Sequence, residues 1–172
     1  MDNFQLARTA SLHSHTRPFY GGVFSPDTLP AKITKYPIFF FCNSDMSYET
    51  GTHWLLICLR DPDHHPFYFD SLGKKPEEHN VLIRDFLSLH GPEYQSCEYR
   101  VQNYNTRTCG FYCLYVADLF CCGYSTEEIL EKFEPTNLAY NEMIVQEYVN
   151  GHMLIINNQP FKSSQWPVLF RP

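Results

Sequence analysis

Three short apolar runs lie in the middle of the chain and are separated by polar segments. They cover residues 37–43 (PIFFFCN), 53–59 (HWLLICL) and 66–71 (PFYFDS). Runs of this length between turn residues are typical of buried strands. The Asp-Pro pair in Asp61–His65 indicates a turn, so we expect the second and third runs to form a hairpin. Residues 95–101 alternate in polarity and predict a further strand.

Other segments have helical patterns. Residues 77–89 place apolar side chains on one face, and the long apolar segment 109–122 ends at Gly123. Residues 125–133 open with a capping box formed by Ser125 and Glu128. Three more helices are expected over residues 3–10, 25–34 and 137–150. Strands in the middle and helices after them indicate an α+β fold.

Composition limits the class of protein. The 172 residues include 44% hydrophobic and 19% charged residues, which fits a single globular domain over residues 1–172. A net charge of −6 argues against nucleic-acid binding by the whole surface. No apolar run is long enough to cross a membrane, and residues 1–12 lack the apolar stretch of a secretory signal. We therefore expect an intracellular protein, cytosolic or nuclear and not secreted, with reduced cysteines.

Cys109 stands out among the seven cysteines. It opens the predicted helix 109–122, where the helix dipole lowers the pKa of a thiol. Gly110 leaves room for a substrate carbonyl, and free backbone amides at a helix start can stabilise an oxyanion. The remaining cysteines lie in or near predicted strands or in the apolar helix, as buried thiols commonly do: Cys42, Cys58, Cys97, Cys113, Cys121 and Cys122.

A nucleophilic thiol needs a base held in a fixed orientation. Among eight histidines, His53 alone begins an apolar strand at a loop junction. In the predicted hairpin, Asp70 ends the neighbouring strand and could orient the imidazole as a cross-strand neighbour. Gln102 precedes Cys109 by seven residues, and its neutral amide suits an oxyanion hole. The remaining histidines are expected at the surface.

Together, His53-Trp54, Phe69-Asp70-Ser71, Gln102 and Cys109-Gly110 resemble the adenovirus-type (adenain-like) cysteine proteases, whose clan includes the SUMO-deconjugating enzymes. The order of histidine, acid, glutamine and cysteine matches that clan and differs from papain. The segment Pro18–Leu29 also resembles an adenoviral stretch. Asp70 stands where adenoviral enzymes have Glu and SUMO proteases have Asp.

The resemblance implies a central mixed β-sheet flanked by helices and an endopeptidase that cleaves viral precursors near Gly-Gly or Gly-x-Gly sites during virion maturation. Its setting would be the host nucleus and the virion. It implies catalytic roles for Cys109, His53, Asp70 and Gln102 and no required metal. Adenoviral enzymes are activated by DNA and by a viral peptide, and Cys97 lies roughly where a peptide-linked cysteine would be. The acidic net charge argues against activation by DNA.

Three alternatives remain open. A ubiquitin-like deconjugase, acting on SUMO, NEDD8 or ubiquitin, would use the same scaffold and also cleave after glycine. A non-catalytic binding module would keep the scaffold, although the full set of four residues argues against it. A zinc protein could use Cys113, Cys121, Cys122 and a histidine, but structural zinc usually uses separated pairs on loops.

Overall fold

A five-stranded mixed sheet forms the centre of the protein. The computed structural model describes residues 1–153, so the end of the expected domain, residues 154–172, lies outside the described residues. The strands are β1 (Tyr20–Phe24), β2 (Ile38–Asn43), β3 (Trp54–Leu59), β4 (Phe67–Phe69) and β5 (Gln95–Ser96), adjacent in chain order. β2, β3 and β4 pair antiparallel, whereas β1 and β5 pair parallel with their neighbours at the two edges.

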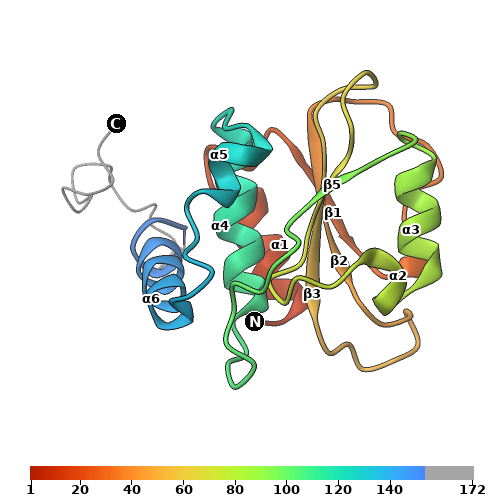
Figure 1. Ribbon diagram of the computed structural model, residues 1–172. Helices are drawn as coiled ribbons and strands as arrows, with labels where there is room; N and C mark the ends of the chain where they lie inside the picture. Colours follow the sequence, from red (N-terminus) through yellow and green to blue (C-terminus); the bar gives the residue numbers. More distant parts are fainter. Residues whose placement is uncertain (154–172) are drawn as a thin grey trace.

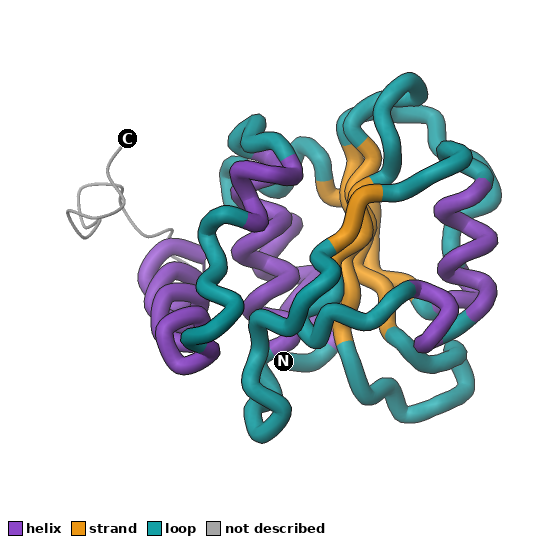
Figure 2. Tube along the Cα trace, viewed as in Figure 1, coloured by secondary structure: helices purple, strands orange, loops and turns teal. Residues whose placement is uncertain are grey.

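Helices cover both faces of the sheet (Figure 1). On one side lie α1 (Asn3–Leu12), α4 (Cys109–Cys121), α5 (Thr126–Leu130) and α6 (Leu138–Tyr148), with a π-helical turn at Val149–Met153. On the other side lie α2 (Pro76–His79) and α3 (Val81–Ser88). Figure 2 shows the strands edge-on between the two helical layers. This is the α+β arrangement of a mixed sheet flanked by helices that the sequence predicts.

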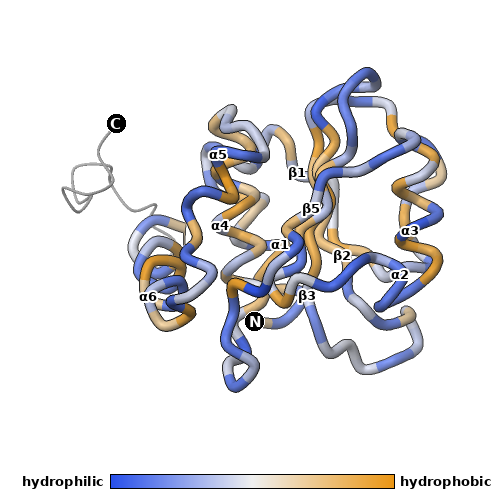
Figure 3. Tube along the Cα trace, in the orientation of Figure 1, coloured by the Kyte–Doolittle hydropathy of each residue, from blue (hydrophilic) through white to orange (hydrophobic). Residues whose placement is uncertain are grey.

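Strands β2, β3 and β4 contribute side chains to two separate apolar cores because successive side chains point to opposite faces. In β2, Phe39 and Phe41 pack towards α4, whereas Phe40 and Cys42 pack towards α3. In Figure 3 the central strands are apolar while most of the connecting loops are polar. Burial on both faces explains why these strands appear as continuous apolar runs rather than alternating patterns.

The three central strands and the hairpin are confirmed, because β3 and β4 pair antiparallel across the turn at 61–65. The long helix is also confirmed, as is the Ser125–Glu128 capping box at the start of α5. The N-terminal helix extends to Leu12, and α6 lies within the predicted range 137–150.

Several boundaries were predicted wrongly. The helix expected over 77–89 is two helices, since Asn80 has extended backbone and its side chain caps α3 by accepting from the Leu82 amide. The strand expected over 95–101 ends at Ser96. The amides of Val101 and Gln102 instead donate to the Ser71 carbonyl at 2.9 Å.

Two further differences involve glycine and proline. Only a 3₁₀ turn, Pro26–Thr28, forms within the helix expected over 25–34, consistent with the break that Pro30 introduces. Strand β1 was not predicted, because its sequence YGGVF has little apolar pattern. Gly21 is needed there, since an added Cβ would lie 2.3 Å from the Phe40 ring.

Among the residues that the structure describes, no helix combines the length and the apolar character needed to cross a bilayer.

Candidate active site

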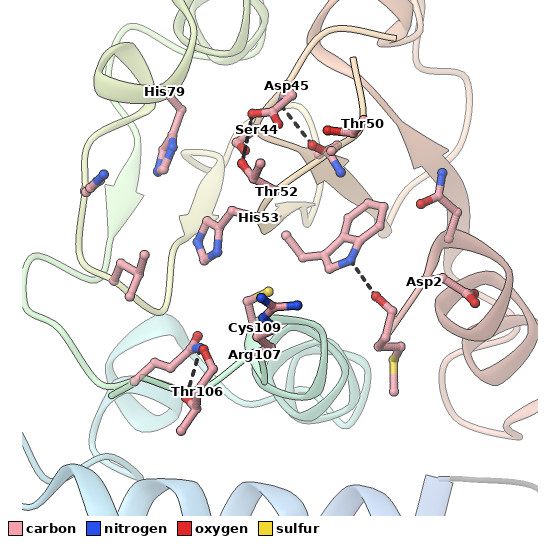
Figure 4. A pocket seen from close by; sticks show the side chains of 18 of the residues that line it. Asp2, Ser44, Asp45, Thr50, Thr52, His53, His79, Thr106, Arg107 and Cys109 are labelled. Carbon is pink, nitrogen blue, oxygen red and sulfur yellow. Dashed lines mark hydrogen bonds between the residues drawn. The ribbon is translucent and has the colours of Figure 1, made fainter. Parts of the chain in front are cut away.

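Cys109, His53 and Gln102 open into one cleft with a volume of about 1090 Å³. Its walls come from the start of α1, the loop between β2 and β3, the segment after β4, and the loop before α4. Figure 4 shows His53 between His79 and Cys109, with Thr106 and Arg107 beside the cysteine. The topology therefore brings together residues from four separate parts of the chain.

Cys109 is the first residue of α4, as predicted, and is 9% exposed. Thr108, the N-cap, makes no side-chain cap to the helix because its hydroxyl donates to Glu142 at 2.8 Å. The first amides of α4 are therefore not covered by a capping side chain. These amides lie at the N-terminus of the helix, where they can stabilise a thiolate or an oxyanion.

The glycine after the nucleophile has a different surrounding from the one expected. A Cβ added to Gly110 would lie 3.2 Å from Met1 Cβ and 3.4 Å from Trp54 Cδ1. The Trp54 indole also donates to the Met1 carbonyl at 3.0 Å. The missing side chain thus makes room for the start of the chain and Trp54, which together form one wall of the cleft.

His53 is held by Asp70 through a 2.6 Å hydrogen bond at Nε2. Since Asp70 engages Nε2, Nδ1 is the ring nitrogen available to the Cys109 thiol, with which His53 also hydrogen-bonds. Extending the β3–β4 register, in which Leu56 pairs with Phe69, places Asp70 opposite Leu55. The bond to His53 is therefore diagonal rather than directly cross-strand, a spacing that side chains on one sheet face can bridge.

Asp70 is fully buried yet well satisfied. Its Oδ1 also accepts from the Leu72 amide at 2.9 Å, and its Oδ2 accepts from the Lys74 amide at 3.1 Å. The second partner of Oδ2 is His79 Nε2 at 2.9 Å. Burial acts to raise the pKa of Asp70, but the bonds to His53 and His79 outweigh it and hold that pKa well below its usual range. Asp70 is thus a fixed anion.

The pKa shifts of the pair favour an imidazolium and a thiolate. Burial lowers the pKa of His53, but its hydrogen bonds to Asp70 and Cys109 outweigh burial and raise it to about 9. Burial likewise raises the pKa of Cys109, while the hydrogen bond and charge of His53 lower it to a net value below that of a free thiol. A thiolate beside an imidazolium is the reactive form of a catalytic cysteine.

Gln102 lines the cleft and is 3% exposed. Its Oε1 accepts from the Ser71 hydroxyl at 2.6 Å, and its Nε2 donates to the Thr106 carbonyl at 3.1 Å and hydroxyl at 3.2 Å. The side chain is held in a fixed orientation near Cys109. An oxyanion would compete with Thr106 for the amide hydrogens.

Sequence reasoning missed two supporting residues. His79 was expected at the surface, but its side chain is 8% exposed, bonds to Asp70 and stacks on His53 with ring centroids 5.5 Å apart. Glu142 in α6 binds the hydroxyls of Thr106 and Thr108 and so fixes the loop before the nucleophile. No local pattern marks either residue, because both act through partners distant in sequence.

Donor atoms of His53, Asp70 and His79 lie within 4.8 Å of one another, which is close enough to hold a metal ion. Ordinary hydrogen bonds of 2.6 and 2.9 Å already account for this arrangement.

The Cys97 side chain is buried, so a partner cannot reach it in this conformation. It is 2% exposed, and its thiol donates to the Tyr99 carbonyl at 3.1 Å. Burial raises its pKa to about 11, which makes a poor nucleophile for disulfide exchange. The role of Cys97 in binding an activating peptide stays a prediction.

No protein-family model matches the chain. No curated protein matches it either. Among solved structures, the ASFV pS273R protease matches with a TM-score of 0.50 and 16% identity, over 81% of this chain and 64% of that one. A selenomethionine structure of the same protease gives a TM-score of 0.41 and 22% identity, over 73% of this chain and 47% of that one.

The present chain thus spans 64% of the length of the ASFV protease it matches. At this identity the likeness concerns the fold, which the chain shares with a viral protease.

Proposed function

We propose that this chain is a cysteine endopeptidase of the adenovirus-protease type, cleaving viral precursor proteins near Gly-Gly or Gly-x-Gly sites during virion maturation. One observation carries the proposal: His53 hydrogen-bonds both to the buried anion Asp70 and to Cys109, at the start of a helix that opens into a cleft. This is the arrangement of nucleophile, base and orienting acid that acyl transfer requires.

The proposed reaction starts from the Cys109 thiolate and the His53 imidazolium. The Cys109 thiolate attacks the carbonyl carbon of the scissile amide, and the oxyanion is stabilised by backbone amides at the start of α4 and by the Gln102 side chain. His53 then protonates the leaving amine. Water, deprotonated by His53, hydrolyses the thioester and returns the thiol. Asp70 keeps the imidazole in one orientation throughout.

The fold shared with the ASFV pS273R protease supports proteolysis as the activity class. The adenoviral specificity and the virion setting rest on the sequence resemblance. On the same basis we propose that the protein acts in the host nucleus and the virion, that it needs no metal for catalysis, and that a peptide partner activates it.

A ubiquitin-like deconjugase is the second candidate. Asp70, which stands where SUMO proteases have Asp, favours it, and the same chemistry would serve. The two candidates differ in what must bind outside the cleft: a short Gly-Gly peptide suffices for a maturation protease, whereas a deconjugase also recognises the folded surface of its substrate.

The test compares two substrates at equal concentration. One is a peptide library carrying Gly-Gly and Gly-x-Gly sites, and the other is a set of SUMO, NEDD8 and ubiquitin fusions. Preferential cleavage of the peptides supports the maturation protease, and preferential cleavage of a fusion rejects it in favour of the deconjugase. Cys109→Ala controls for contaminating proteases, and Cys121→Ser is the matched thiol control. Full activity in Cys109→Ala would reject both functions.

A further inference from the structure

A second cluster of histidines around a buried carboxylate lies at the other end of α4. Its carboxylate is Asp118, nine residues after Cys109 and thus about 14 Å further along the helix axis. His13 is the C-cap of α1, and His15 follows it in the turn that leaves that helix. Helices α1 and α4 lie side by side on the same face of the sheet (Figure 1).

Both imidazoles point at one oxygen atom. His13 Nδ1 and His15 Nδ1 each lie 3.4 Å from Asp118 Oδ1. Asp118 is 1% exposed. Within the part of the chain that the structure describes, neither His13 Nδ1 nor Asp118 Oδ1 has a hydrogen-bond partner. The two buried atoms are within ion-pair distance of each other but make no short hydrogen bond, which is costly unless something else supplies the missing partner.

Other histidine–aspartate pairs in the protein provide an internal standard. They are separated by 2.6 Å at His53–Asp70, 2.9 Å at His79–Asp70 and 2.6 Å at His64–Asp61. The 3.4 Å separations are too long for that class of contact. They agree with the spacing of ligands around tetrahedral zinc, because bonds of about 2.0–2.1 Å place neighbouring ligand atoms about 3.3–3.4 Å apart.

A fourth donor is close. Cys122 follows Asp118 by four residues and so lies on the same side of the helix. Its sulfur is 3.6 Å from His15 Nδ1. A Zn–S bond of about 2.3 Å places a thiolate about 3.6 Å from a neighbouring imidazole nitrogen. Cys122 is exposed, so its side chain is free to turn towards the cluster.

The surroundings hold the donors in place. The other oxygen of Asp118 accepts a hydrogen bond from the Tyr148 hydroxyl of α6. The turn that carries the histidines is tied back to α1 by the buried Thr16 hydroxyl, which donates to the Ala10 carbonyl at 2.8 Å. Outer hydrogen bonds that orient ligating groups are a regular part of metal sites.

We propose that His13, His15 and Asp118 bind a zinc-type ion, with the Cys122 thiolate as the fourth ligand. Imidazole, carboxylate and thiolate are the donors that zinc takes in proteins. With four protein ligands the site is closed and therefore structural rather than catalytic. The ion joins the end of α1 to the end of α4, and so fixes the helix whose first residues line the cleft at Cys109.

Metal content is measured on full-length Cys109→Ala protein, which removes the other reactive thiol that could bind zinc. After dialysis into metal-free buffer, zinc affinity is determined by competition with a zinc-sensitive dye. We expect one zinc per chain. His13→Ala and His15→Ala should each weaken binding by more than the roughly 10- to 100-fold that loss of an outer partner costs.

Two further variants keep the result interpretable. His15 is half-exposed, so His15→Ala tests the site without threatening the fold. His79→Ala tests whether the ion instead occupies the cluster near Cys109, and it should leave the affinity unchanged. Absence of zinc binding, undiminished binding in both His13→Ala and His15→Ala, or loss of binding in His79→Ala alone would each overturn the proposal.

Cobalt reports on the fourth ligand. Cobalt(II) bound to the Cys109→Ala protein should show visible bands of a tetrahedral complex and a near-ultraviolet thiolate-to-metal band. Cys122→Ser should remove the thiolate band, and Cys121→Ser should keep it. A cobalt complex without the thiolate band would reject Cys122 as a ligand, and an octahedral spectrum would reject the zinc-type geometry.

Discussion

A cluster of two histidines and one aspartate lies near each end of α4, and the two clusters differ in geometry. At one end Asp70 lies between His53 and His79 at hydrogen-bond distances of 2.6 and 2.9 Å. At the other end Asp118 faces His13 and His15 at 3.4 Å, an ion-pair separation longer than either distance at Asp70. A histidine that shares a hydrogen bond with a carboxylate can gain and lose a proton in a fixed orientation. Histidines that approach a carboxylate only at the longer ion-pair distance leave room for a cation between the donor atoms.

The two clusters therefore share a residue composition, and the separation of their donor atoms is what differs between the proposed proton-transfer site and the proposed metal site.

The largest effect is expected at the nucleophile and its base. Cys109→Ala or His53→Ala should lower kcat/KM for a Gly-Gly peptide by at least about 10⁴-fold, because removal of either member of such a pair abolishes covalent catalysis. Initial rates with a fluorogenic peptide measure the change, and thermal melts confirm folding. Cys121→Ser should retain activity. A loss below tenfold in His53→Ala would place the base elsewhere.

Asp70→Asn should lower kcat/KM by about 10³- to 10⁴-fold, because the neutral amide no longer orients and charges the imidazole. It should also move the pH profile. In the native protein the imidazolium persists until its pKa of about 9, so activity falls above that pH. Without the carboxylate the pKa of His53 decreases, and the alkaline limb moves to lower pH.

The check is a profile of kcat/KM from about pH 5 to pH 10, which reports the groups of the free enzyme. On the acid side, activity should rise with ionisation of Cys109, below the usual pKa of a thiol. An alkaline limb that stays in place in Asp70→Asn would contradict the assigned cause of the His53 shift.

Metal removal should affect the proposed zinc cluster at Asp118 and not the cluster at Asp70. A ligand at about 100 times its Kd stabilises the folded state by about 2.7 kcal/mol. For a chain of this size that corresponds to about 5–10 °C in Tm. Chelation should therefore lower Tm by this amount in the native protein, as measured by calorimetry, and leave the Tm of His15→Ala unchanged. An equal fall in both proteins would show that the chelator acts elsewhere.

The smallest effect is expected at His79. His79→Gln removes an imidazole that bonds Asp70 and stacks on His53. Loss of one hydrogen bond to a charged group costs about 1.5–3 kcal/mol. Because Asp70 keeps two backbone donors, we expect kcat/KM to fall by only about tenfold, with KM unchanged. His65→Gln, at an exposed position, is the matched control. A fall that appears in KM alone would mean that His79 contacts substrate rather than positioning Asp70.

Much of the fold could be predicted from local patterns. Strands β2, β3 and β4 were recognisable because two buried faces require continuous apolar runs, and α4 because eleven of its thirteen residues are buried. The edge strand β1 was missed, since Gly21 is required there by the close approach of the Phe40 ring on the neighbouring strand and not by strand propensity. The break at Asn80 was missed because a cap residue within an apolar helical pattern resembles a tolerated polar position.

The candidate site divides in the same way. The sequence by itself was enough to predict Cys109, His53, Asp70 and Gln102 as the candidate nucleophile, base, acid and oxyanion donor, because helix starts and strand ends are local features and the order of the four residues is specific. Only the tertiary structure decided which groups support them. His79 reaches Asp70 through a loop, Glu142 reaches Thr108 from α6, and His13 meets Asp118 from the opposite end of the chain. Such contacts depend on how separate elements pack, and hydrophobic periodicity carries no information about which polar side chains that packing will bring together.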